Sequence, residues 1–134
     1  MTILNPYLLP KVRSEILRQS IGGKLPGGIQ TTPMPCAARL AGFLGLPCEF
    51  GTTVGCHYGR IGKGTSTKVS DLFLIAGCRL CHDLMDPERD PRGMEIAARY
   101  PRAFYERLRD AHHETMARWI AMGVLPLPAD AEII

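Results

Sequence analysis

The longest regular pattern of apolar and polar positions in the chain lies between residues 101 and 122. Apolar side chains recur there at intervals of three or four residues, and charged side chains fill the other positions, as in an amphipathic helix. Pro101 suits the first position of a helix, and Gly123 suits the residue just past its end. We therefore predict a helix from 101 to 122 whose core-facing stripe consists of Phe104, Leu108, Ala111, Met116, Trp119 and Ile120.

Shorter patterns predict the elements on either side of this helix. Residues 11–20 have the periodicity of a short helix, and residues 94–100 predict a further helical turn packed beside the long helix. Residues 21–35 are rich in glycine, proline and threonine, a composition typical of irregular structure. We therefore expect an irregular N-terminal arm, and a tail over residues 125–134, where two prolines occur.

Two segments in the middle of the chain have the composition of strands. Residues 52–58 and 72–76 are rich in β-branched, aromatic and other apolar residues, and a loop rich in glycine, lysine and hydroxyl side chains separates them at 59–68. A helix is expected after the second strand, with Asp83 and Asp86 in its first turn, where carboxylates complement the helix dipole. This order of elements predicts an α+β fold.

Size and charge limit the classes of protein to which the chain can belong. It has 134 residues and a net charge of +3, which predicts a single domain, 1–134, and permits nucleic-acid binding without demanding it. Residues 1–10 lack the basic and apolar regions of a signal peptide, and no apolar segment is long enough to cross a bilayer. We therefore expect a cytoplasmic protein without a membrane partner. In a reducing compartment its five cysteines are more often metal ligands than disulfides.

Four of the five cysteines form two pairs with the character of a metal site. Cys78 and Cys81 are separated by two residues, so both thiols can reach one metal ion from a tight knuckle that holds His82 beside it. Cys36 and Cys48 lie upstream, joined by a segment with glycine and proline that can fold back on itself. We predict one structural Zn²⁺ bound by these four thiolates. The wider spacing of the first pair also fits a second interpretation, two buried cysteines that act as small apolar residues.

The order of cysteine pair, strand, glycine- and lysine-rich loop, second strand and CxxCH resembles the HNH, or ββα-metal, nucleases. The similarity is greatest to the YbcO family of small prophage-encoded proteins, which are regarded as nucleases. It covers residues 36–86 and rests on His57-x-x-Arg60, on the loop with Lys68 and Asp71, and on Cys78-x-x-Cys81-His82-Asp83. The resemblance implies a zinc-stabilised ββα-metal core over residues 36–86, preceded by the irregular arm and followed by the long C-terminal helix.

The resemblance also implies a role for each residue of this pattern. The protein would be a metal-dependent endonuclease that hydrolyses phosphodiester bonds in nucleic acid, with DNA as the expected partner. His57 would be the general base that takes a proton from the attacking water, and Asp71 would orient it. His82 would hold a divalent cation such as Mg²⁺ or Mn²⁺ on the scissile phosphate. The phosphate backbone would be bound by Arg60, Lys63 and Lys68, and the structural zinc by Cys36, Cys48, Cys78 and Cys81.

One residue departs from the family pattern. Many HNH sites carry an acidic metal ligand directly before the catalytic histidine, and here that position is Cys56, whose thiolate is a poor ligand for Mg²⁺. Three interpretations stay open: His82 binds the cation together with Asp71 or Asp83, the cation is a transition metal, or catalysis is lost. In the last case the chain is a non-catalytic, zinc-stabilised nucleic-acid-binding module. A c-type haem also attaches to CxxCH, but that chemistry usually accompanies export and leaves the first cysteine pair without a role.

Overall fold

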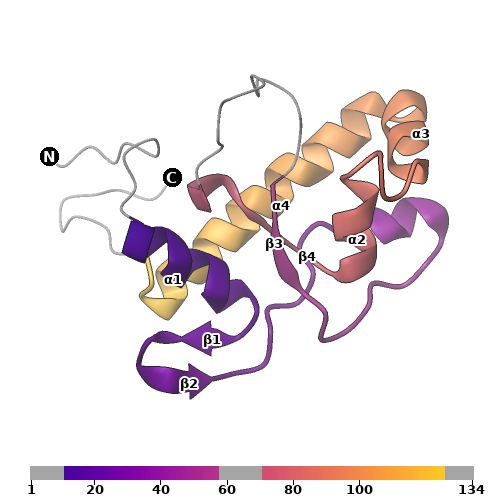
Figure 1. Cartoon of the computed structure of the whole chain (residues 1–134). Coiled ribbons are helices and arrows are strands. Elements are labelled where there is room, and N and C mark those ends of the chain that lie inside the picture. The colour runs from indigo at the N-terminus through magenta and orange to yellow at the C-terminus, as the bar shows by residue number, and fades with distance from the viewer. Residues whose placement is uncertain (1–10, 58–70, 126–134) are drawn as a thin grey trace, which may run out of the picture.

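The computed structural model describes residues 11–57 and 71–125 of the chain. The longest element is helix α4 (Pro101–Met122), which runs diagonally behind the short strands in Figure 1 and confirms the predicted range. Gly123 ends it in a left-handed conformation with a φ of 75°, and its N–H donates to the carbonyl of Ile120 at 3.1 Å. The buried side chains of the helix are Phe104, Leu108, Ala111, Thr115 and Trp119, with Met116 and Ile120 partly buried beside them.

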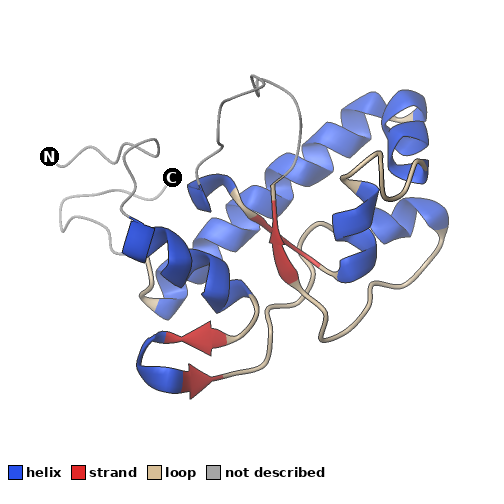
Figure 2. Cartoon of the chain, in the orientation of Figure 1, coloured by secondary structure: helices blue, strands red, loops and turns tan. Residues whose placement is uncertain are grey.

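Two short antiparallel strands, β3 (Val54–Cys56) and β4 (Ile75–Gly77), form a hairpin (Figure 2). Both predicted strands are present but shorter than expected. In the second, Asp71–Phe73 forms a 3₁₀ turn, η4, and the N–H of Leu74 closes it on the carbonyl of Asp71 at 3.2 Å. This turn places Asp71 inside the molecule, where only 6% of the residue is exposed.

Helix α2 (Arg79–Leu84) begins earlier than the sequence pattern predicts. Cys78, rather than His82, precedes the helix, because its backbone is extended and its carbonyl already accepts the N–H of His82 at 2.8 Å. The helix has six residues, so Asp83 lies in its last turn and Asp86 lies beyond its end. The expectation that these carboxylates complement the dipole in the first turn is therefore wrong.

Helix α1 (Lys11–Ile21) extends the predicted short helix by one residue. The arm that follows is less irregular than predicted, because strands β1 (Lys24–Leu25) and β2 (Ile29–Gln30) pair in a small antiparallel hairpin. Its turn, Pro26–Gly28, depends on Gly27, whose φ of 82° is a left-handed conformation that glycine adopts without strain. The prediction of an irregular arm holds only for the residues after this hairpin.

Two further helical segments complete the described fold. The 3₁₀ helix η3 (Leu40–Leu44) follows Cys36, and helix α3 (Arg92–Arg99) precedes α4, close to the predicted helical turn. Helices α2 and α3 approach each other closely at Gly93. An ideal Cβ added to this glycine would lie only 1.7 Å from the carbonyl oxygen of Leu84. A glycine at this position is what allows the two helices to approach so closely.

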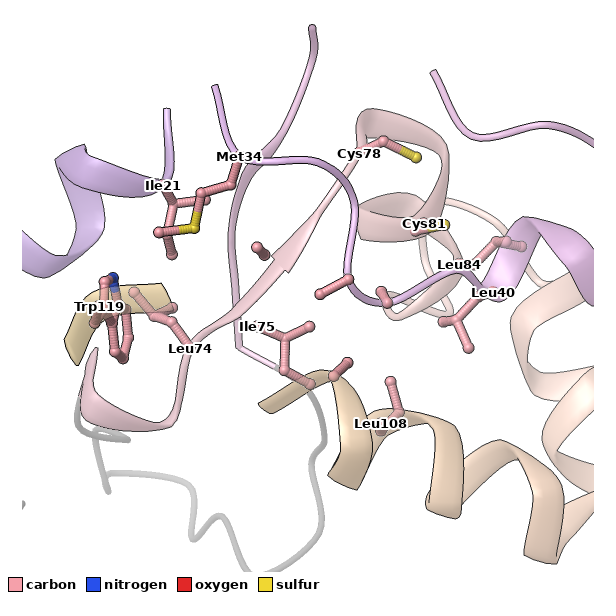
Figure 3. Close-up of a cluster of buried hydrophobic side chains, with 14 of the residues drawn as sticks. Ile21, Met34, Leu40, Leu74, Ile75, Cys78, Cys81, Leu84, Leu108 and Trp119 are labelled. Carbon is pink, nitrogen blue, oxygen red and sulfur yellow. The ribbon is translucent and has the colours of Figure 1, made fainter. Parts of the chain in front are cut away.

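A cluster of buried side chains joins α1, β4, α2 and α4 (Figure 3). Trp119 donates its indole N–H to the carbonyl of Leu17 at 3.2 Å and to the hydroxyl of Ser20 at 3.0 Å, which ties α4 to α1. The buried hydroxyl of Thr115 accepts the N–H of Ala76 at 3.0 Å, which ties α4 to β4. The fold is thus of the α+β class. Within its described residues, no helix has both the length and the apolar character needed to cross a membrane.

Candidate metal centre and histidine site

Four cysteines, two of them from one turn of chain at the start of α2 and two from upstream segments, meet in one cluster. The sulfur atoms of Cys36, Cys48, Cys78 and Cys81 all lie within 4.8 Å of one another. Those of Cys48 and Cys81 are 3.8 Å apart. A tetrahedral site with Zn–S bonds of about 2.3 Å has sulfur–sulfur edges of about 3.8 Å, so this donor set fits Zn²⁺. The cysteines predicted to form the zinc site do come together in a cluster that is compatible with the metal.

The geometry favours one of the two interpretations of the first cysteine pair. Cys36 and Cys48 are only partly buried, and their sulfurs belong to the cluster, so they are not isolated apolar residues of the core. Cys78 and Cys81 are wholly buried at the end of β4 and the start of α2 (Figure 3). A haem-attachment motif gives no reason for all four thiols to meet, whereas a closed metal site does.

Backbone N–H groups point at the sulfurs of this cluster. The N–H of Arg39 lies 3.4 Å from Sγ of Cys36, and the N–H of Ala41 lies 3.4 Å from Sγ of Cys81. Arg39 has a φ of 47°, a left-handed conformation uncommon for a residue other than glycine, and this turns the chain shortly after Cys36. Such donors stabilise the thiolate form that a metal ion requires.

Hydrogen bonding within the cluster also shifts its acid–base properties. The bond between Cys81 and Cys36 lowers the pKa of Cys36 to about 5 and raises the pKa of Cys81 far above its ordinary value. Burial, followed by the charge of Cys36, raises the pKa of Cys48 to about 12. The thiolate is therefore favoured at Cys36 over Cys48 and Cys81. Four thiolates this close repel one another unless a cation balances their charge. In its fully ionised form, the cluster is therefore suited to a bound cation.

Helix α4 positions the segment that carries Cys36. The guanidinium of Arg118 donates to the carbonyl of Pro35 at 2.6 Å and to the carboxylate of Glu114 at 2.9 Å. Glu114 in turn lies 3.4 Å from the guanidinium of Arg39. These contacts hold the chain on both sides of Cys36, so the first half of the candidate metal site is supported by the long helix.

The fifth cysteine, Cys56, lies outside the cluster. Its side chain is 1% exposed at the end of β3, and its sulfur faces the carbonyl oxygens of Val54 at 3.6 Å and Gly77 at 4.0 Å. Burial raises the pKa of this thiol to about 12. Cys56 is therefore an uncharged group near neutral pH, at the position where many HNH nucleases carry an acidic residue.

His57 follows β3 directly and pairs with a buried carboxylate. Its Nε2 lies 2.9 Å from Oδ1 of Asp71, and the His57 side chain is 41% exposed. An ionised carboxylate only accepts hydrogen bonds, so this bond assigns the proton of a neutral imidazole to Nε2. Nδ1 then carries the free lone pair. The structure thus brings together the two residues for which the resemblance implies a general base and its orienting partner.

Asp71 also binds helix α1, a contact that the sequence did not reveal. Ser14 donates its hydroxyl to Oδ2 of Asp71, and the guanidinium of Arg18 lies 3.9 Å from the same oxygen. Fifty-seven residues separate Ser14 from Asp71, and a serine within an amphipathic helix carries no signal of such a partner. The contact arises from the packing of α1 against β3 and η4.

His82 lies beside a different carboxylate. Its Nδ1 is 3.4 Å from Oδ1 of Asp83, and the guanidinium of Arg89 is 3.8 Å from the same oxygen. Asp71 is bound to His57 and Ser14. Of the two carboxylates expected to bind a cation with His82, it is therefore Asp83 that lies beside it. Across residues 11–57 and 71–125, only the cysteines form a group of three or more side chains arranged to hold a metal ion. A catalytic cation at His82 therefore has two candidate protein ligands and stays a prediction.

The loop that we expect to bind the phosphate backbone lies outside the described residues. The roles of Arg60, Lys63 and Lys68 therefore stay predictions. On α1, the guanidinium of Arg18 lies beside the Asp71 carboxylate, and its side chain is 54% exposed. A cation thus adjoins the histidine–aspartate pair independently of the loop.

Comparisons of the chain with known protein families, with curated proteins and with solved structures find no match. The resemblance to the HNH nucleases stays a hypothesis, and functional inference rests on the geometry and chemistry of the residues themselves.

Proposed function

We propose that the protein is a metal-dependent nuclease that hydrolyses phosphodiester bonds in nucleic acid, with DNA as its expected substrate. The observation that carries this proposal is the His57–Asp71 pair, which adjoins the first strand of a strand–strand–helix unit. The helix of that unit begins at the cysteine cluster and carries His82. The resemblance to the HNH nucleases implies the same arrangement. It places an oriented imidazole beside a strand hairpin, and a helix that begins at a cluster of four thiols follows this hairpin.

In this proposal His57 is the general base. With Nε2 committed to Asp71, Nδ1 is available to take a proton from a water molecule, which then attacks the phosphorus atom. Asp71 holds the imidazole in the reactive tautomer and stabilises the positive charge that the ring acquires. Because Asp71 is buried, water competes little for its oxygens, and the orientation of the ring is maintained.

The zinc ion has a structural role in this proposal. It would be held by the four clustered cysteines and would join the segments before and after the β3–β4 hairpin. A chain of this size buries a small core, and a closed thiolate site supplies folding free energy that such a core lacks. A divalent cation at His82 would supply charge stabilisation on the phosphate. Mg²⁺ is commonly bound by only one or two protein ligands together with water and substrate oxygens.

A cleavage screen tests the proposal. The zinc-loaded protein is incubated with supercoiled, linear duplex, single-stranded and branched DNA and with RNA, each in the presence of Mg²⁺, Mn²⁺, Ni²⁺ or Zn²⁺. We expect cleavage of at least one form of DNA with at least one of these metals. The variant His57→Ala, purified in parallel, controls for contaminating nucleases and should not cut. If the wild-type protein cuts no substrate with any metal, the proposal is contradicted.

A second candidate is a non-catalytic, zinc-stabilised nucleic-acid-binding module. Two observations favour it. The buried Cys56 thiol lies where many HNH nucleases carry an acidic metal ligand, and residues 11–57 and 71–125 hold no second group of side chains arranged to bind a metal. This candidate predicts tight, salt-sensitive binding of DNA without cleavage under any divalent metal. A binding titration at two salt concentrations, run beside the cleavage screen, therefore separates the two functions.

A further inference from the structure

We propose that Ser14 of helix α1 is a positioning residue, which fixes the carboxylate of Asp71 and through it the imidazole of His57. The geometry of the three side chains carries this inference, while its consequence for cleavage rests on the proposed nuclease function. Ser14 makes α1, an element outside the strand–strand–helix unit, a part of the site.

Among the described residues, Asp71 has one close donor at each of its oxygens. His57 donates to Oδ1 at 2.9 Å, and the hydroxyl of Ser14 donates to Oδ2. The guanidinium of Arg18 lies farther from Oδ2, at 3.9 Å, and its side chain is largely exposed to solvent. An exposed charge at this distance adds little directional force. Among residues 11–57 and 71–125, Ser14 is therefore the residue that sets the direction of the second oxygen.

Fixing both oxygens has a geometric consequence that fixing one does not. A carboxylate held at a single oxygen can still turn about its last side-chain bond, because that torsion is broad and nearly two-fold. With Oδ2 held by Ser14, Oδ1 stays in the direction that meets Nε2 of His57. Asp71 is 6% exposed, so water does not readily replace a missing donor. Loss of the hydroxyl should free the carboxylate plane and weaken its hold on the imidazole.

Helix α1 is anchored independently of this contact, as a positioning element must be. Arg13 donates to the carbonyl of Val124 at 2.6 Å, and the indole of Trp119 donates to the carbonyl of Leu17 at 3.2 Å. Neither contact involves the hydroxyl of Ser14. Alanine is also the best helix former, so Ser14→Ala should leave α1 folded and attached to α4.

The test compares the wild-type protein with Ser14→Ala, with Ser14→Thr as the rescue variant and with Gln19→Ala as the control at an exposed position of the same helix. Long-range proton–nitrogen NMR spectra, recorded at a pH where imidazole is neutral, report the tautomer of each of the four histidines. The spectrum of His57→Ala assigns the signals of His57. We expect one dominant Nε2–H tautomer of His57 in the wild type, in Ser14→Thr and in Gln19→Ala. In Ser14→Ala the minor tautomer should increase several-fold.

Cleavage kinetics provide the second readout. With a substrate found by the cleavage screen, kcat of Ser14→Ala should fall about 10-fold while KM changes little, as is typical when a partner that orients a functional histidine is removed. Ser14→Thr should restore the rate, and Gln19→Ala should leave it unchanged.

The positioning role and the nuclease function fail separately in this design. If Ser14→Ala leaves the tautomer of His57 as in the wild type, the positioning role is overturned, whatever the cleavage assay shows. If the tautomer shifts but the wild type cleaves nothing, the positioning role stands and the nuclease function fails. Zinc content and thermal unfolding show whether each variant is folded. If Ser14→Ala unfolds, Ser14→Cys, which keeps the volume but donates weakly, takes its place with the same expected shift.

Discussion

The four clustered cysteines differ in exposure, although their sulfurs lie together. Cys78 and Cys81 are wholly buried, whereas Cys36 and Cys48 are partly exposed. The buried pair comes from a single turn of chain that ends β4 and begins α2, and both thiols also belong to the hydrophobic core. At the residue scale, the candidate metal site and the core therefore share side chains, so loss of Cys78 or Cys81 affects both.

Cys81→Ala should release zinc and unfold the protein, because the metal-binding free energy of a small domain is largely folding free energy. Cys56→Ala, at a buried cysteine outside the cluster, is the matched control. It should keep its zinc and lose only about 1 kcal/mol of unfolding free energy. Metal analysis and thermal unfolding of both variants test the prediction. A Cys81→Ala protein that still binds zinc as the wild type does would show that this cysteine is not a ligand.

His112 gives the fold a contact that is sensitive to acid. Its Nε2 bonds to the carbonyl of Leu72 at 3.0 Å, and its ring stacks on Phe73 with the ring centroids 5.5 Å apart. Burial lowers the pKa of His112, and the neighbouring His113 lowers it further, although the bond to Leu72 acts in the opposite direction. Since the folded pKa is lowered, the unfolded chain binds the proton more readily. This contribution to stability is complete above the ordinary pKa of about 6.5 and is lost as the pH falls below it.

His112→Gln replaces the ring N–H donor by an amide N–H donor and cannot titrate, so it should remove this part of the pH dependence. The measurement is urea unfolding of wild type and variant at pH about 8 and at pH about 5, on either side of the ordinary pKa of histidine. The unfolding free energy should fall more for the wild type than for His112→Gln. Protonation of the cysteine cluster affects both proteins alike and cancels in the comparison. Equal losses would contradict the assigned role of His112.

At the scale of elements, the sequence predicts helix ends well where the chemistry of a single residue sets them. Pro101 and Gly123 bound α4 as predicted, because proline has no N–H to leave unpaired and glycine adopts the left-handed conformation without strain. The start of α2 was misplaced, since Cys78 is not a usual capping residue and the turn of the knuckle begins the helix. The second strand is shorter than its apolar run, because the run also contains the η4 turn that buries Asp71.

The sequence likewise predicts some parts of the candidate site and not others. The cysteine cluster could be predicted, because two cysteines separated by two residues, together with a further pair, are typical of a metal site. The partnership of Ser14 with Asp71 could not, since it depends on how α1 packs against a turn 57 residues away. The pairing of His57 with Asp71 was anticipated only through a family resemblance, and nothing in the spacing alone fixes it.

Gly93→Ala should destabilise the protein through the contact between α2 and α3. The added Cβ would lie 1.7 Å from the carbonyl oxygen of Leu84, so the two helices would have to separate. Overpacking of this kind costs about 1–3 kcal/mol of unfolding free energy. Gly42→Ala is the control, because its Cβ would meet nothing within 4 Å. Urea unfolding gives the free energy of unfolding of both variants. Equal values would mean that α2 and α3 are not packed as described.

At the scale of the whole molecule, α4 is the common support of both candidate sites. Through Arg118 it holds the carbonyl of Pro35, next to Cys36, the first cysteine of the cluster. Through Trp119 it holds α1, the helix that carries Ser14. The candidate metal centre and the histidine pair therefore depend on one scaffold, while the predicted phosphate-binding loop lies outside the described residues.

Replacing Arg60, Lys63 and Lys68 together by glutamine should weaken DNA binding and flatten its salt dependence. Each phosphate contact that is lost lowers the slope of log K against log salt by about 0.9 for duplex DNA. Arg102→Gln, which removes a cation that is 91% exposed on α4, is the control and should leave the slope unchanged. Binding titrations over a range of salt concentrations give the slopes. An unchanged slope in the triple variant would mean that the loop does not bind the phosphate backbone.

The most direct measurement is the single-turnover cleavage rate of wild type and His57→Ala, prepared side by side, with the zinc content and melting temperature of each. His57→Ala should bind zinc and melt close to wild type, because His57 is not a member of the cysteine cluster. Its cleavage rate should fall by at least about 100-fold, the usual contribution of a general base. His113→Ala, which removes an exposed histidine of α4, should cut at the wild-type rate. A His57→Ala protein that folds, keeps its zinc and still cuts at the wild-type rate would contradict the proposed function.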